Sequence, residues 1–263
     1  MLTLYHAPGS VCSQKVRLGL ALMDLAYDSR VLNLQAGEQF APAYRALNAD
    51  AVVPTLVDDG LVVVESSLIL EYLDREYNAG RLMPQHRAGR VAAQHWLLRC
   101  LAIHAAINTL SFATALRGPI IAKSTPAEID ALVAKIPDPV MGAKRKDLIV
   151  NGLGSVYVGQ ALMHLRRTLD DMQTAMAQTP WMGGAAIGIA DVALVAYVDR
   201  LDRLGLAGFW DDRPAIAPWL AAWRATDAYA TAIENHMPAA SAEAMRKAGQ
   251  DHWPALRQRW ADL

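Results

Sequence analysis

A short turn near the N-terminus carries two hydroxyls and a thiol. Ser10, Cys12 and Ser13 follow the β-type run from Leu2 to Tyr5 and open a helical pattern. A thiol ligand placed there would meet a hydroxyl donor and the positive end of a helix dipole, and both lower a thiol pKa. The same residues also suit helix capping with a small buried cysteine, and capping alone would explain them.

Two later segments could hold a peptide-like ligand. A cis bond before Pro54 would leave the backbone N–H and C=O of Val53 free to pair with an extended ligand. The alternative is an ordinary trans proline that opens a strand. Glu65 and Ser66 lie where a strand turns into a helix, and the free N–H groups of that helix favour a carboxylate. Here the alternative is that Ser66 only caps its own helix.

The elements expected to position these residues form an α/β layer. Asp58-Asp59-Gly60 is a hairpin signal between two β-rich runs. Over the first 80 residues or so, the pattern predicts βαβαββα with mixed strand directions. The expected strands are Leu2 to Tyr5, Tyr27 to Leu34, Val53 to Val57 and Leu61 to Val64. Three helices are expected: one that starts at Ser13, one from Phe40 to Leu47 and one from Glu65 to Tyr77.

The composition changes near residues 79 to 86, where a domain boundary is expected. Beyond it Ala, Leu, Met, Trp and Arg dominate, which predicts an all-helical second domain. The two prolines in Ile136-Pro137-Asp138-Pro139 must interrupt any helix. The expected helices are Arg87 to Leu116, Pro126 to Ala134, Ala143 to Gln178, Ala190 to Leu204, Ala217 to Ala225 and Ala239 to Gln250.

In combination these segments resemble the glutathione transferase family, over about residues 1 to 230. The resemblance implies a thioredoxin-like glutathione-binding domain at residues 1–80 and an all-helical domain at 87–263 that forms the electrophile pocket. In one departure, Gly188 stands where the family has a Ser or Thr cap, so Asp191 could lack its reciprocal partner. The match is carried by Pro8 to Ser13, Ala46 to Asn48, Val53 to Leu56, Glu65 to Leu73 and Gly188 to Ala193.

The resemblance also implies glutathione as the co-substrate and places it in the first domain. Glu65 and Ser66 would hold its γ-glutamyl end, and Val53 beside a cis Pro54 would pair with its cysteinyl backbone. Gln39 resembles the family residue near the glycyl carboxylate, although it could equally be an exposed polar residue of a helix.

The partner of the glutathione thiol is expected to be a serine. The resemblance indicates Ser10 or Ser13 and leaves the choice open, whereas Cys12 would instead form a mixed disulfide, which is redox chemistry. Because no tyrosine occupies this turn, tyrosine-type classes are disfavoured. Lowering the thiol pKa by about two units is worth ~2.7 kcal/mol.

The substrate is expected to be a hydrophobic, aromatic electrophile attacked by the glutathione thiolate. His104 and Asn108, four residues apart, share a helix face and could line its pocket, although such residues more often lie in solvent. The proline-rich and then basic stretch from Ile136 to Lys146 resembles a bacterial branch that cleaves β-aryl ethers of lignin-derived aromatics.

Three other functions stay open. The turn and the Gly37 to Phe40 segment also resemble the branch that isomerises maleylacetoacetate, although the long insert and the C-terminal extension argue against it. A non-catalytic glutathione-binding protein could use the same scaffold. Cys12 could also drive a disulfide reductase.

Composition disfavours other classes of function. A net charge of -1 and a pI near 6.7 make nucleic acid a poor partner. Two cysteines without a CxxC pair fit a reduced, cytoplasmic setting. The histidines show no metal-binding spacing, and no apolar stretch of about 18 residues that would cross a membrane is expected. The family resemblance implies a homodimer.

Overall fold

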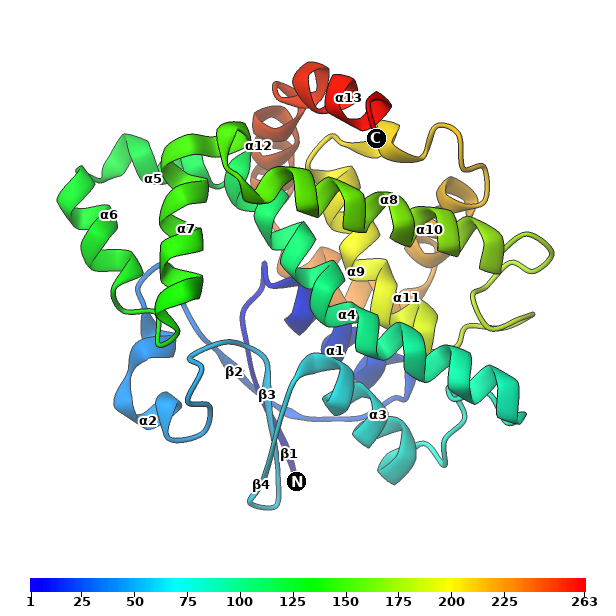
Figure 1. The fold of residues 1–263 in the computed structure, drawn as a ribbon. Helices are drawn as coiled ribbons and strands as arrows, with labels where there is room; N and C mark the ends of the chain where they lie inside the picture. Colours follow the sequence, from blue (N-terminus) through cyan, green and yellow to red (C-terminus); the bar gives the residue numbers. More distant parts are fainter.

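The first domain is a four-stranded mixed sheet with helices on it (Figure 1). The computed structural model describes residues 1–263. Strands β1 (Leu2–His6), β2 (Asp28–Val31), β3 (Thr55–Asp58) and β4 (Leu61–Val64) lie in the order β2-β1-β3-β4. The β1 and β2 strands are parallel, and β3 is antiparallel to both β1 and β4. Together with the three helices of this domain, this arrangement confirms the predicted thioredoxin-like fold.

The helices of this domain match the expected ones apart from their ends. They are α1 (Val11–Leu22), α2 (Pro42–Arg45), which follows a 3-10 turn at Glu38–Phe40, and α3 (Ser66–Tyr77). The α1 helix begins two residues before the expected start. It does so because Ser10 is the N-cap, and its Oγ accepts the Ser13 N–H at 3.3 Å.

The second domain is all helical, as predicted. Its central pair is α4 and α9, because α4 packs on both α8 and α9, and α9 also packs on α1 of the first domain. The helices are α4 (Arg87–Ala113), α5 (Arg117–Lys123), α6 (Pro126–Val133), α7 (Pro139–Asn151), α8 (Tyr157–Ala175), α9 (Ile189–Arg203), α10 (Ile216–Arg224), α11 (Asp227–Ala232), α12 (Ala239–Gln250) and α13 (Trp253–Ala261).

The expectation of one helix from Ala143 to Gln178 was wrong. Asp138 caps α7, with its Oδ1 accepting the Val140 N–H at 2.8 Å, so α7 begins at Pro139. Gly152 has a φ of 53°, which ends α7, and α8 then leaves at 82° to it. As a result α5, α6 and α7 form a lobe at one side of the molecule, in which α7 packs on α4 (Figure 1).

The α4 helix is more apolar than the sequence analysis allowed. It contains an 18-residue window with a mean hydropathy of 1.3, which is enough by length and composition to cross a membrane. The helix instead lies against α8 and α9, and 56% of that window is buried in the structure. Its apolar character therefore serves mainly the core.

Two buried arginines fix the turn that precedes α1. Arg17 is 2% exposed, and its guanidinium donates to the carbonyls of Ala7 and Pro8 and, from Nε, to the carbonyl of Ala232 at 2.7 Å. Arg200, from α9, donates to the carbonyl of Gly9. Because Ala232 and Arg200 belong to the helical domain, these bonds join the two domains at the turn.

The buried carboxylate of Asp191 accepts more hydrogen bonds than we expected from a glycine at the capping position 188. Glycine offers no side chain to accept a hydrogen bond, but its N–H donates to Asp191 Oδ2 at 2.9 Å. The N–H of Met182 and the indole Nε1 of Trp219 both donate to Oδ1 at 2.8 Å. Burial nevertheless raises the pKa of Asp191. This carboxylate ties the start of α9 to α10 and to the preceding loop.

Replacing Asp191 with alanine should destabilise the protein by about 3 kcal/mol or more, because three donors, one of them buried with the carboxylate and two partly buried, lose their acceptor. The free energy of unfolding measured in urea tests this. Asp191→Asn is the matched control and should lose less, since its amide oxygen can still accept from Met182 and Trp219. A loss below about 1 kcal/mol for Asp191→Ala would contradict the assignment.

Candidate active site

One contact joins a thiol of the first domain to an imidazole of the second. Cys12 is the second residue of α1, and its Sγ lies 3.3 Å from Nδ1 of His104 on α4. The thiol is partly exposed. The contact therefore requires that α1 and α4 stay docked across the domain boundary.

The surroundings of Cys12 make it acidic. Burial raises the pKa of the thiol, but the charge and hydrogen bond of His104, with the charge of Lys15, outweigh burial and lower the pKa to about 6. The thiolate in turn raises the pKa of His104. A free cysteine has a pKa near 8.5. The two opposite shifts favour a thiolate on Cys12 beside an imidazolium on His104.

Lys15 and Tyr197 complete this cluster, and sequence reasoning missed both. Lys15 is fully buried, and its Nζ donates to Ser67 Oγ at 3.1 Å and lies 4.9 Å from the centre of the Tyr197 ring. The Tyr197 hydroxyl is 3.9 Å from Cys12 Sγ. Burial, with the charge of the thiolate, raises the pKa of Tyr197 well above its ordinary value, so it stays a neutral donor. The sequence did contain one signal for Lys15: it lies three residues after Cys12, so the two side chains share a face of the helix.

The two candidate serines have different surroundings. Ser10 is half-buried and caps α1 as an acceptor, so its own O–H stays available as a donor to a ligand. Ser13 is fully buried, and its Oγ accepts the Ala7 N–H at 3.3 Å. This burial argues against Ser13 as a donor to the thiolate of a ligand.

The start of α3 has the features of an anion site. Ser66 is the first residue of the helix rather than its cap, so the interpretation that Ser66 caps its own helix was wrong. No side chain caps the first N–H groups of α3, and the residue in the N-cap position, Glu65, is exposed with a φ of 69°. A non-glycine residue in this conformation is characteristic of functional sites. These N–H groups are available to a carboxylate.

The remaining glutathione residues lie on loops of the same domain. The Val53–Pro54 peptide bond is cis, as the resemblance implied. The β3 register begins at Thr55, so the backbone of Val53 lies outside the ladder. Gln39 is half-buried, and its Nε2 donates to the carbonyl of Leu34 at 3.4 Å.

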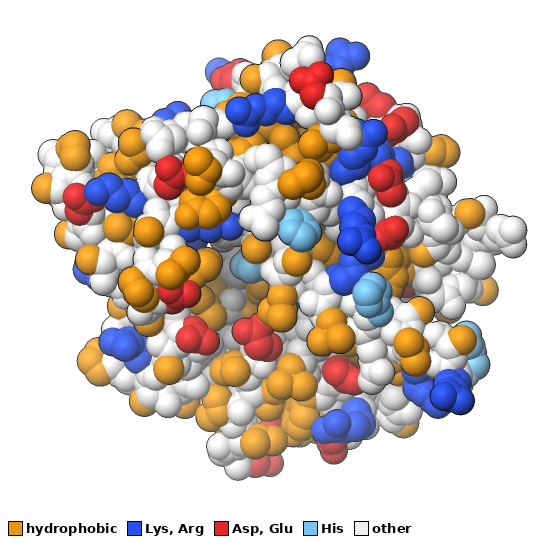
Figure 2. Space-filling view, viewed as in Figure 1, with side chains coloured by type: hydrophobic (Ala, Val, Ile, Leu, Met, Phe, Trp, Pro, Cys, Tyr) orange, Lys and Arg blue, Asp and Glu red, His pale blue; other side chains and the backbone are white.

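One face of α4 continues from the sulfur cluster towards α7. His104, Asn108 and Phe112 follow one another at four-residue steps and so share a face of the helix. Arg145 of α7 donates to Asn108 Oδ1 at 3.3 Å, and its guanidinium carbon is 3.5 Å from the centre of the Phe112 ring. Figure 2 shows the surface hollowed between the lobe that contains α7 and the α4 helix, with basic, histidine and acidic side chains near its edge.

Comparison with known proteins agrees with this geometry. Residues 4–81 match the glutathione S-transferase N-terminal domain, and residues 126–226 match the corresponding C-terminal domain. The chain belongs to the glutathione S-transferase family. The predicted family is confirmed, and so is glutathione as the co-substrate of this transferase.

Two relatives share sequence with this transferase to different extents. It is 25% identical over 236 residues, 88% of its own length and 94% of the relative, to a tetrachloro-p-hydroquinone reductive dehalogenase from Sphingobium chlorophenolicum. It is 39% identical over 84 residues to the maleylacetoacetate isomerase of Mus musculus, which is 31% of this chain but only 39% of the isomerase. The second likeness is therefore confined to a part of each protein.

Two solved structures share the fold. The β-etherase LigF from Sphingobium sp. strain SYK-6 superposes with a TM-score of 0.78 at 20% identity, over 89% of this chain and 99% of that one. A glutathione transferase family member from Pseudomonas fluorescens Pf-5, with two glutathione molecules bound, gives 0.66 at 20% identity, over 88% and 91% of the two chains. At these identities the likeness establishes the fold.

The acidity of Cys12 can be measured directly. A pH titration of the thiolate by its ultraviolet absorbance, or by its alkylation rate, should give a midpoint near pH 6. His104→Gln should move that midpoint upward, towards about 8.5, because it removes the largest influence that opposes burial. Cys100→Ser is the control: Cys100 is 2% exposed, so its removal should leave the titration unchanged. An unshifted midpoint in His104→Gln would contradict the ion pair.

Proposed function

We propose that this glutathione transferase works by thiol exchange, with Cys12 as the nucleophile towards the sulfur of a bound glutathione conjugate. The observation that carries the proposal is the 3.3 Å contact between Cys12 Sγ and His104 Nδ1, which accompanies a thiol pKa of about 6. A sulfur nucleophile with a pKa slightly below the ambient pH combines high thiolate content with high reactivity.

The chemistry proceeds in two balanced steps. The Cys12 thiolate attacks the glutathione sulfur of a conjugate GS–R, a disulfide bond forms, and the carbon–sulfur bond breaks. The carbon R leaves with the electron pair and takes a proton from the His104 imidazolium. A second glutathione, whose thiol proton returns to His104, attacks the mixed disulfide and leaves as glutathione disulfide. The carbon is reduced, and two glutathione sulfurs are oxidised.

The residues of the first domain would hold the glutathione moiety. Glu65 and the uncapped start of α3 at Ser66 suit the γ-glutamyl end, which carries both an ammonium and a carboxylate. The backbone of Val53, beside cis Pro54, suits the cysteinyl amide, and Gln39 suits the glycyl end. Glutathione bound in this way would bring its sulfur to the amino end of α1.

A reductive reaction also fits the relative that matches over most of the chain. That protein is named a reductive dehalogenase of a chlorinated hydroquinone. Reduction of carbon needs a source of two electrons, and disulfide formation between Cys12 and glutathione supplies them. We therefore favour an activated aromatic compound as the carbon partner R.

The nucleophile can be tested with matched variants. Cys12→Ser should lower turnover of a glutathionyl aryl conjugate roughly 10³-fold or more, as expected for loss of a nucleophile. Mass spectrometry after exposure to glutathione disulfide should show one glutathionyl group on the wild type and on Cys100→Ser, and none on Cys12→Ser. If Cys12→Ser keeps full turnover, the thiol-exchange mechanism is wrong.

A serine-based transferase is the second candidate, and the free hydroxyl of Ser10 favours it. Ser10 would donate to the glutathione thiolate, which would attack an electrophile directly, with β-aryl ethers of lignin-derived aromatics as one substrate class. In that case Ser10→Ala would impair turnover and Cys12→Ser would not. The isomerase alternative is less favoured, because the likeness to the isomerase covers only 84 residues.

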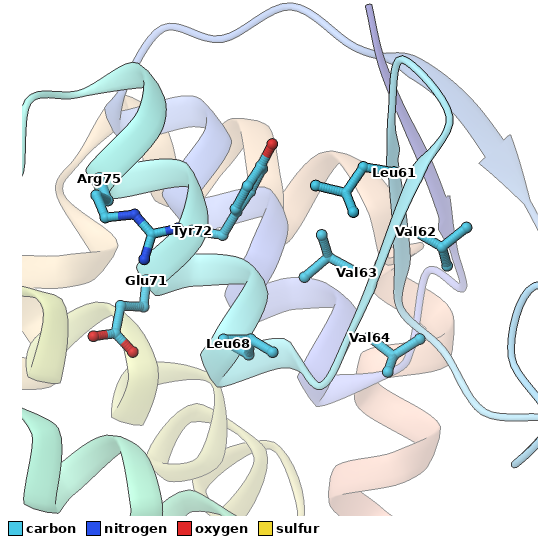
Figure 3. A pocket seen from close by; sticks show the side chains of 8 residues that line it. All are labelled: Leu61, Val62, Val63, Val64, Leu68, Glu71, Tyr72 and Arg75. Carbon is cyan, nitrogen blue, oxygen red and sulfur yellow. The ribbon is translucent and has the colours of Figure 1, made fainter.

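We also propose that the chain forms a homodimer in the cytoplasm. Apolar side chains are exposed along α4, at Leu98 (72%) and Leu101 (63%). An apolar groove of about 440 Å³ lies between β4 and α3, where Leu61 and Val63 face Tyr72 (Figure 3). Figure 2 shows hydrophobic side chains over these same elements on one side of the molecule. Exposed apolar patches of this kind mark protein interfaces.

The dimer can be tested by sedimentation. The wild type should sediment as a dimer, and a Leu98→Glu/Leu101→Glu variant should sediment as a monomer, because two charges would be buried in the interface. Val156→Glu is the control, since Val156 is 81% exposed at the start of α8, outside this face. A monomeric wild type would refute the dimer without affecting the thiol chemistry.

A further inference from the structure

Arg145 of α7 is an inward-facing arginine that has neither an acidic partner nor a backbone carbonyl as acceptor. By contrast, Arg203, Arg213 and Arg224 pair with aspartates. Arg17 and Arg200 lack an acidic partner too, but both donate to backbone carbonyls of the turn before α1. Arg145 is half-buried, and its only protein hydrogen bond is the one to Asn108 Oδ1 at 3.3 Å. Since a guanidinium carries five N–H donors, most of them are left for a ligand.

The charge of Arg145 is uncompensated by its own helix. Asp147 is two residues further along α7, so it faces another direction, and Asn151 donates to it at 2.7 Å. Lys144 adds a second positive charge, since its Nζ lies over the Tyr157 ring at 5.1 Å without an acidic partner. Burial lowers the pKa of Arg145 to about 10, and no carboxylate opposes this shift. The group is still a cation at neutral pH.

Arg145 and the reactive sulfur lie at opposite ends of the same face of α4. The thiol of Cys12 meets His104, and Arg145 meets Asn108 and stacks on Phe112. Four residues of helix rise by about 6 Å, so one to two such steps separate the sulfur from the guanidinium. This distance suits one substituted aromatic ring with its reacting carbon at the sulfur and its far substituent at Arg145.

The chemistry of the two ends defines the ligand. A guanidinium binds a carboxylate through two parallel hydrogen bonds, and it binds a phenolate through one charged bond. The Phe112 ring holds the guanidinium plane in place and leaves its edge free for such a contact.

We propose that this transferase prefers aromatic substrates that carry an anionic oxygen substituent, a carboxylate or a phenolate, and that Arg145 binds this substituent. The inference rests on the proposed function in one respect: it takes the hollow beside His104 as the place where the glutathione-linked carbon reacts. It does not depend on whether Cys12 or Ser10 assists the sulfur.

The test uses a matched pair of electrophiles, 4-chloro-3-nitrobenzoate and its methyl ester, with glutathione and the full-length protein. Arg145→Gln should lower kcat/KM for the acid about 10- to 100-fold, the value of a charged hydrogen bond, and change that for the ester less than about threefold. Arg145→Lys should retain part of the preference for the acid over the ester, because lysine keeps the positive charge but lacks the paired N–H donors of a guanidinium. Lys146→Gln removes a charge of the same helix that pairs with Asp130 at 2.6 Å, so it should affect neither compound.

A binding measurement separates this inference from the catalytic proposal. The glutathione conjugates of the acid and the ester are titrated calorimetrically into Cys12→Ser and into Cys12→Ser/Arg145→Gln. Tighter binding of the acid conjugate that is lost with Arg145 supports the inference, even if Cys12 proves dispensable for turnover. If Arg145→Gln weakens both conjugates equally, or neither, the inference is wrong whatever the role of Cys12.

Discussion

The contact between the Cys12 thiolate and the His104 imidazolium depends on two domains at once. The sulfur stands at the amino end of α1, and the imidazole projects from α4. Burial alone would raise the pKa of the thiol, and only the charges of His104 and Lys15 reverse that effect. The acidity of Cys12 is therefore a property of the docked pair of domains, and it would be lost if the helical domain moved away.

Buried cations hold the two domains in that position. Arg17 and Arg200 reach the carbonyls of the turn before α1 from the two sides of the boundary, and Lys15 is held by Ser67. A buried charge without partners is very unfavourable, so each of these groups favours the arrangement in which it donates to these acceptors. The contacts that fix the domain boundary thus also fix the geometry around Cys12.

Local sequence signals were enough for most of the fold and for part of the site. The hairpin at Asp58-Asp59-Gly60 followed from neighbouring residues alone. For the Val53–Pro54 bond and the start of α3 at Ser66 the local sequence allowed two interpretations, and the family resemblance indicated the cis bond and the free helix start that the structure contains. The four-residue spacing of His104 and Asn108 placed them on one face of α4. The break at Gly152 was missed because an apolar pattern runs through it and a single glycine can be tolerated within a helix.

The remaining site residues could not be read from the sequence because they meet only in the folded chain. Tyr197 reaches Cys12 from 185 positions away, and Arg145 reaches Asn108 from 37. In a short stretch of sequence, Tyr197 looks like a core residue of α9, and Arg145 looks like one of three solvated basic residues on α7. Only the absence of a nearby carboxylate distinguishes Arg145 from Lys146, and that absence depends on the packing of α4 against α7.

The proposed preference for an anionic substrate is compatible with a net charge of -1, because the cations of the site are not distributed evenly over the protein. His104 and Lys15 lie at one end of the α4 face and Arg145 at the other, while many aspartates of the helical domain are paired with arginines elsewhere. Positive charges at a site raise the local concentration of anions, and here the carboxylate of Glu65, whose charge also acts on His104, partly opposes them. If the proposed function is correct, the charges of His104 and Lys15 that lower the pKa of Cys12 would also favour glutathione, an anion, and Arg145 would extend that preference to an aromatic partner of the same charge.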